Sequence, residues 1–485
     1  MFSGERFSRS RTGCLQCRHK HRKCDEKQST CTFCITHRQK CEYPSALRWV
    51  QREQPKLSRH KSRLQRSPEE GWSDVRGQAP LILANAVFQS ADEQSAWEYY
   101  IRLVSSNVPA LDGPDNPYRQ LSVTALSSPV LRETILCIST EHMLNFGLGS
   151  VSVAAERQRQ MLRSIAQGLR TLDNRTSISL EGSVMSVDNY EALLAAIILQ
   201  GVVVAQTEDG AVEPHVKCAA FLIRALGLFR QEPRTPLVRM CVQRFAMVDV
   251  MLAISRQRRP FAPIDFILYQ PDESRWDRTE PSFLKMTGCP QPLMCLLVLL
   301  SHLACDVDDR LESGKPISDL LVEAFKLETE IRALGSQYNN TTADRSKWSH
   351  LEILAECFYW TAHILLARRI FRDETRSIRV QHLAWTCFRL MDLLPTGCGP
   401  DSSLPQPFYL AAREAVTEED RSWVRRKHEA MIGYYRELQR NAAMRLTETI
   451  WAEDDRLNRL QSKDAQKLHD RFIRQLDRHS CLFIF

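Results

Sequence analysis

Apolar residues recur at three- and four-residue spacing from about residue 90 onward, which is the pattern of amphipathic helices. This spacing predicts helices over roughly 152–173, 213–230, 237–255, 290–305, 315–335, 348–372, 376–394, 420–448 and 452–478. Ser128-Pro129 predicts a further helix start, because serine caps helices and proline suits the first helical position. Residues 188–191 have the form of a capping box before the apolar run 193–204. Alternating β-type runs are scarce, so we expect a large all-helical domain.

Two apolar stretches, 192–205 and 287–305, have the composition of candidate membrane segments. A bilayer span needs about 20 consecutive, predominantly apolar residues. The first stretch is shorter than that, and Pro290, Gln291, Pro292 and His302 interrupt the second. We therefore expect both to be buried helices, and we expect no membrane partner.

Six cysteines precede the helical region and follow a different pattern. They form two sets of three with the same internal spacing, at Cys14, Cys17, Cys24, Cys31, Cys34 and Cys41. The N-terminal residues lack the apolar segment of a secretory signal, so we expect a reducing compartment, in which clustered thiols favour metal over disulfides. Thiolates suit structural zinc, and the segment is predicted to be a zinc module.

The number of cysteines bears on the number of metal ions. Two tetrahedral zinc ions need eight ligand positions, so six cysteines suffice only if two thiolates each bridge both ions. The alternative is a single zinc held by four cysteines, with two to spare. The duplicated spacing favours two ions, because a single site would use the two halves differently.

Charge is distributed unevenly along the chain. Residues 1–66 contain 17 Lys and Arg against 5 Asp and Glu, whereas the whole chain has 65 against 58 and a formal net charge of +7. The remainder is therefore mildly acidic. A basic module joined to such a body indicates a nucleic-acid-binding head on a globular regulatory domain.

The cysteine module resembles the fungal Zn2Cys6 binuclear-cluster transcription factors, through residues 12–26, 31–34 and 41–43. The resemblance implies that Cys14 and Cys31 bridge two Zn²⁺ ions. It also implies that Cys17 and Cys24 complete one site, and that Cys34 and Cys41 complete the other. The family usually has proline two residues before the fourth cysteine, where this chain has Ser29. A serine leaves that loop less constrained than proline does.

The same resemblance predicts how the module contacts DNA. Binuclear-cluster modules place a helix in the major groove, where lysine and arginine read guanine. By resemblance, Lys20 and His21 contact bases, typically in CGG triplets. The other basic side chains are expected to contact phosphates or to offset the charge of the cluster, with simple solvation as the alternative for each: Arg18, Arg22, Lys23, Arg38 and Lys40.

The predicted organisation has three parts: a Zn2Cys6 DNA-binding domain at 10–44, a flexible basic linker at 45–80, and a helical regulatory domain at 81–485. Residues 115–119 and 125–129 also resemble the helical regulatory domain that often follows this zinc module. The linker contains a second basic cluster at 56–66, but Leu57 and Leu64 give only one heptad step, too few for a coiled coil. The protein is expected to bind DNA either as a monomer or as a homodimer formed through its helical body.

These features predict a nuclear, sequence-specific DNA-binding regulator of RNA polymerase II genes that works with the transcription machinery or co-regulators. No enzyme is expected, since the chain lacks a phosphate-binding glycine loop, a His-Glu-x-x-His motif and a nucleophile elbow. The alternative is a zinc-dependent nucleic-acid-binding protein without direct transcriptional activity, such as an RNA binder. Such a protein would more often carry exposed aromatic residues, and the module has only Phe33 and Tyr43.

Overall fold

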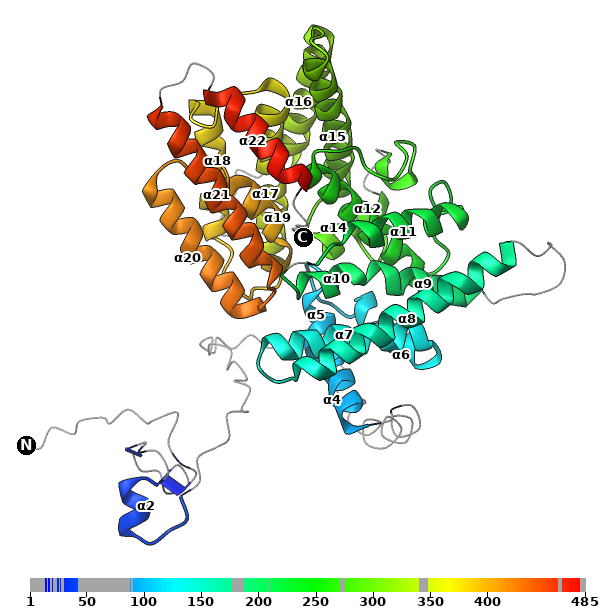
Figure 1. Cartoon of the computed structure of the whole chain (residues 1–485), viewed down its shortest axis with the longest axis vertical. Helices are drawn as coiled ribbons and strands as arrows, with labels where there is room; N and C mark the ends of the chain where they lie inside the picture. Colours follow the sequence, from blue (N-terminus) through cyan, green and yellow to red (C-terminus); the bar gives the residue numbers. More distant parts are fainter. Residues whose placement is uncertain are drawn as a thin grey trace, which may run out of the picture. The chain divides into compact units, whose positions relative to one another are not determined.

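A computed structural model divides the chain into two compact units, Met1–Arg76 and Gly77–Phe485 (Figure 1). It describes residues 14, 16–17, 20, 24–25, 27, 30–41, 88, 90–176, 187–208, 210–270, 275–339, 348–460 and 465–479, except the side chains of 172–176, 187–189 and 336–339. The predicted linker at 45–80, with its basic cluster at 56–66, lies outside these residues. Helices and no strands occur among the residues described, which confirms the all-α prediction.

The second unit is a succession of helices connected mostly by short turns (Figure 1). Their bounds are α4 (Ala91–Tyr99), the π-helix η1 (Tyr100–Val104), α5 (Ser105–Asn107), α6 (Pro117–Ser127), α7 (Pro129–Asn145), α8 (Val151–Thr176), α9 (Val187–Ile198), α10 (Gln200–Ala205), α11 (Glu213–Ala225), α12 (Pro236–Arg256), η2 (Ile267–Tyr269), α13 (Arg275–Arg278), α14 (Phe283–Thr287), α15 (Gln291–Glu312), α16 (Ser318–Asn339), α17 (His350–Leu365), the π-helix η4 (Leu366–Phe371), α18 (Ile378–Asp392), η5 (Pro400–Ser403), α19 (Pro405–Ala412), α20 (Glu418–Tyr435), α21 (Gln439–Arg459) and α22 (Ala465–His479).

Helix α12 lies at the centre of this unit. Every residue from Met240 to Arg256 is buried, as expected for a helix that neighbours enclose on all sides. Helices α6, α9, α11, α14, α15 and α22 all pack against it. The core of the unit therefore forms around α12.

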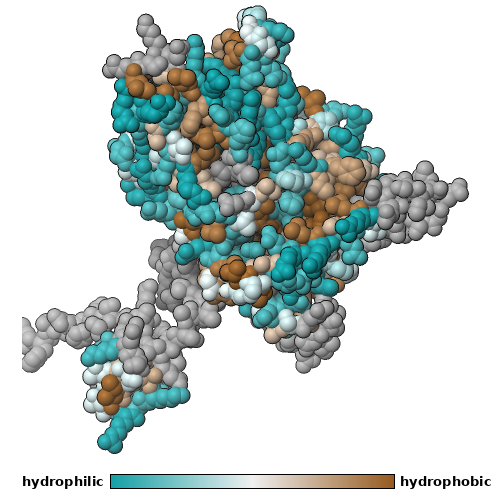
Figure 2. All heavy atoms as spheres, viewed as in Figure 1, coloured by the Kyte–Doolittle hydropathy of each residue, from teal (hydrophilic) through white to brown (hydrophobic). Residues whose placement is uncertain are grey.

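Helix α15 contains most of the apolar stretch 287–305. Among the helices that the structure describes, it is the one long and apolar enough to cross a bilayer, and 72% of its most apolar window is buried within the protein. It packs against α12 and α16, which agrees with its prediction as a buried helix. The face of the second unit drawn in Figure 2 is mostly hydrophilic, with separate hydrophobic patches.

Several predicted helix boundaries are wrong. The pattern 420–448 is not one helix, because α20 ends at Tyr435, Arg436 is left-handed at φ 55°, and α21 then continues to Arg459. The predicted capping box is also wrong, since α9 already begins at Val187 and Asp188 lies within it. Pro129 is the first residue of α7 as predicted, although the side chain of Ser128 makes no capping hydrogen bond.

Two glycines inside helices give a matched test of this packing. A Cβ at Gly335 in α16 would overlap the ring of Tyr359, which is itself held against Trp360 and His363. We expect Gly335→Ala to destabilise the protein by about 1–3 kcal/mol through overpacking. Gly433→Ala in α20, where the methyl group meets nothing within 4 Å, should stabilise it by about 0.5–1 kcal/mol. Urea unfolding of the full chain measures the free energy of unfolding of both variants. A Gly335→Ala protein as stable as the unaltered protein would contradict the close packing of Gly335 against Tyr359.

Candidate metal centre and nucleic-acid interface

The six predicted cysteines come together in the first unit. Five are buried and Cys41 is partly buried. The Sγ atom of Cys14 lies 3.6 Å from those of Cys31 and Cys34, and Cys17 Sγ lies 3.6 Å from Cys31 Sγ. A disulfide bond is much shorter, at about 2 Å. Four sulfurs around one zinc, at the usual Zn–S length, are about 3.8 Å apart, so the donor atoms fit zinc.

The thiols form two overlapping groups of four. In each group the sulfur atoms lie within 4.8 Å of one another, and the groups are Cys14, Cys17, Cys24 and Cys31, and Cys14, Cys31, Cys34 and Cys41. Cys14 and Cys31 belong to both. The arrangement therefore offers two four-sulfur sites from six residues.

The duplication in sequence is also a duplication in backbone geometry. In each half, the N–H of the second cysteine donates to the sulfur of the first at 3.5 Å. The N–H of the first cysteine donates to the sulfur of the third, at 3.4 Å in the first half and 3.3 Å in the second. Lys20 N–H bonds to Gln16 O at 3.0 Å, and the matching bond joins His37 N–H to Phe33 O at 3.1 Å. The two halves thus present their sulfurs in equivalent ways.

Burial and hydrogen bonding set the ionisation of these thiols. Burial raises the pKa of Cys17 and of Cys34. Burial also opposes ionisation of Cys31, but hydrogen bonds from Cys34 and Cys17 outweigh it and lower the pKa of Cys31. Since a metal takes the thiolate form, binding here releases protons.

Asp25 supports the site and was missed in the sequence. Its carboxylate accepts the backbone N–H of Thr32, at 3.2 Å to each oxygen, and also the Thr32 hydroxyl. The hydroxyl bond is the main cause of the lowered pKa of Asp25. Because Asp25 follows Cys24 and Thr32 follows Cys31, this contact ties the two halves together. Aspartate often caps helices, but the partner seven residues away could not be identified from sequence.

The structure places three of the predicted DNA-binding residues. Lys20, Arg38 and Lys40 have exposed side chains. Lys20 lies in the turn after Cys17, and Arg38 has a left-handed φ of 49° just after the short helix α2 (Thr32–Thr36). The other four predicted residues, together with Ser29 and Tyr43, lie outside the described residues: Arg18, His21, Arg22 and Lys23.

Comparison with known families identifies the class of protein. The family described as "Fungal specific transcription factor domain" matches residues 96–473, which is more than half of the chain, so the protein belongs to this family. The "Fungal Zn(2)-Cys(6) binuclear cluster domain" matches residues 12–50. Both matches confirm the resemblance found in the sequence.

Two individual relatives match short segments of the chain. The thiamine biosynthesis regulatory protein of Saccharomyces cerevisiae is 38% identical over 52 residues, which is 11% of this chain and 12% of that protein. Transcription factor lfc1 of Flammulina velutipes is 46% identical over 41 residues, or 8% and 15% of the two chains. The matched segments thus cover less than a sixth of each relative's length. No solved structure matches the chain.

Asp25 gives a test of the support around the thiols. We expect Asp25→Ala to release zinc to a chelator about tenfold faster, as is typical when a group supporting metal ligands is lost. Ile35→Ala, an exposed change in the adjoining helix α2, is the control. A chelator-dye assay of the full chain measures the rate, and equal rates for the two variants would show that the Asp25–Thr32 contact does not hold the site.

Proposed function

We propose that this protein regulates RNA polymerase II genes from the nucleus by binding CGG-like triplets through a two-zinc cluster. The observation that carries the proposal is the pair of overlapping four-thiol groups, next to an exposed lysine in the turn that follows Cys17. The family assignment supports DNA binding and a nuclear role. The metal supplies structural cross-links here, and no catalytic residue is proposed.

The assignment of ligands follows from the shared sulfurs. Cys14 and Cys31 each lie in both groups, so each is proposed to bridge two Zn²⁺ ions. Cys17 and Cys24 complete one site, and Cys34 and Cys41 complete the other. Six thiolates outweigh the charge of two zinc ions, so the cluster is an anion. The surrounding lysines and arginines offset that charge as well as attracting DNA.

The proposed DNA contacts follow from the resemblance to the zinc-cluster family. Lys20 and His21 come after the helical turn of the first half and are proposed to contact base edges. Basic side chains in both halves are proposed to contact phosphates, which fixes the register of the module without reading sequence: Arg18, Arg22, Lys23, Arg38 and Lys40. Phe33 stacks on His37 with ring centroids 4.2 Å apart. This packing at the C-terminal end of α2 supports a role other than base stacking for Phe33.

The helical body is proposed to supply the remaining partners. It has its own apolar core around α12, as a regulatory domain requires. Co-regulators or the transcription machinery are proposed to bind this body, and a homodimer, where one forms, is proposed to use it.

Bridging predicts an unequal loss of metal. We expect Cys14→Ala or Cys31→Ala in the full chain to lose both zinc ions, because each removes a ligand from both sites. Cys17→Ala or Cys41→Ala removes a ligand from one site and should keep about one ion. Cys218→Ala, a partly buried thiol in the body, is the control and should keep both. Native mass spectrometry counts the ions, and one ion in the unaltered protein would support a single site instead.

Base reading by Lys20 predicts a sequence-dependent loss. We expect Lys20→Ala to weaken binding to a selected duplex by about 1–3 kcal/mol, with a smaller effect on random DNA. Lys27→Ala removes an equal charge from an exposed loop position and should affect both DNAs alike. Duplexes selected by the full chain give the triplet and the number of half-sites, and competition with single-stranded RNA tests the nucleic acid. An equal loss on both DNAs for Lys20→Ala would make it a phosphate contact.

A further inference from the structure

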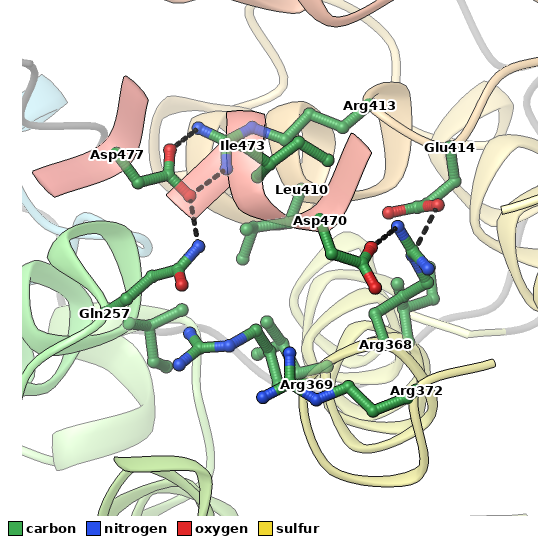
Figure 3. Close-up of a pocket in the computed structure, with 13 residues that line it drawn as sticks. Gln257, Arg368, Arg369, Arg372, Leu410, Arg413, Glu414, Asp470, Ile473 and Asp477 are labelled. Carbon is green, nitrogen blue, oxygen red and sulfur yellow. Dashed lines mark hydrogen bonds and ion pairs between the residues drawn. The ribbon is translucent and has the colours of Figure 1, made fainter. Parts of the chain in front are cut away.

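A cavity rich in arginine lies in the helical body, where the end of α12 meets α17, η4, α19 and α22 (Figure 3). It measures about 60 Å³, counted as the space open to the centre of a water-sized sphere. That is room for several water molecules, and hence for a small polyatomic ion. Neither the zinc module nor the proposed DNA contacts make use of it.

One side of the cavity is formed by Arg369 and Arg372. Figure 3 shows these side chains close together, across from Leu410 and Ile473. Arg369 forms an ion pair with one carboxylate oxygen of Asp308 at 3.0 Å, and Arg372 pairs with the other oxygen of the same carboxylate. Arg372 takes a left-handed φ of 60° at the end of η4. The π-helical turn and this residue together direct both arginines to one place.

The positive charge on this side exceeds its nearest negative charge. Arg474 also contacts Asp308, at 3.3 Å, so three guanidinium groups share one carboxylate that is only 2% exposed. Arg474 has a second partner in Glu312, which is half exposed and therefore offsets less. Buried charges need close compensation, and here it is incomplete.

The other charged residues around the cavity are two arginines and three carboxylates. Arg368 lies 3.0 Å from both Glu414 and Asp470. Arg413 pairs with both oxygens of Asp477, at 3.0 and 3.1 Å. This group carries one more negative than positive charge, so the positive charge of the cavity is concentrated at Arg369 and Arg372.

Donor groups on the same side lack acceptors. The Nε atoms of Arg369 and Arg372 are buried and have no hydrogen-bond partner among the residues that the structure describes. Burial lowers the pKa of Arg369, and the charge of Arg372 lowers it further, although Asp308 opposes this. A buried donor without a partner costs free energy, which an added acceptor would recover.

We propose that this cavity binds a small oxyanion, either inorganic phosphate or the carboxylate of a small metabolite. The planar guanidinium groups of Arg369 and Arg372 suit the paired oxygens of such an anion. Leu410 and Ile473 border the opposite side and limit its size. The site lies in the helical body and is independent of the proposed DNA binding.

Calorimetric titration of the full chain tests the site, with inorganic phosphate in one arm and malonate in the other, at constant ionic strength. We expect saturable binding tighter than about 1 mM in at least one arm, and the arm that binds identifies the anion. Arg372→Gln should weaken anion binding by about tenfold or more, since the substitution removes a positive charge and the paired N–H donors of the guanidinium group. Arg425→Gln is the matched control, because Arg425 forms exposed ion pairs with Glu418 and Glu448. It should bind as the unaltered protein does.

A second variant separates binding from folding. Ile473→Trp leaves every charged side chain in place and fills the cavity. It should therefore abolish saturable anion binding while leaving the helical circular dichroism unchanged. Absence of binding in both arms would overturn the proposal. Equal binding by the unaltered protein, Arg372→Gln and Ile473→Trp would also overturn it, because that result means an adventitious ion only.

Discussion

The first unit depends on the sharing of sulfur between its two halves. In the residues that the structure describes there, the buried core consists of five cysteines, with Phe33 and Cys41 packed at its edge. So small a segment cannot gain enough stability from apolar burial alone. With zinc bound, metal–thiolate bonds would supply the folding free energy, as in other small zinc modules. Cys17 fixes the helical turn that precedes Lys20, and the side chain of Lys20 is exposed after that turn.

The second unit has a different physical basis. Its core is apolar and forms around α12, whose residues Met240–Arg256 are all buried. Many ion pairs lie at the surface or between helices, whereas Asp249 of α12 is buried in the core and pairs with Arg258 at 3.8 Å. The body therefore has an apolar core of its own. The proposed regulation and the proposed DNA binding are thus assigned to units that are stabilised by unrelated interactions.

Sequence was sufficient where the chemistry is local or repeated. The cysteine spacing predicted a zinc module and favoured two ions, because ligand number and duplication are visible in a sequence. The family resemblance predicted the members of each four-sulfur group, and helical periodicity predicted the all-α body. Prediction from sequence failed where the structure depends on backbone conformation or on contacts between distant segments. The left-handed Arg436 that separates α20 from α21 has no glycine to signal it. The Asp25–Thr32 contact and the convergence of Arg369 and Arg372 on Asp308 require knowledge of which segments meet.

The arginine cavity links the most buried helix to the last one. Gln257, directly after α12, donates to Asp477 of α22 at 2.8 Å, and Asp477 in turn holds Arg413 after α19. An anion beside Arg369 and Arg372 would compensate charge at this junction, so its binding free energy would add to the stability of the packed state of α22. The coupling would act within the body and alter how its helices are held together. A small anion could in this way change the surface that the body offers to partners without touching the zinc module.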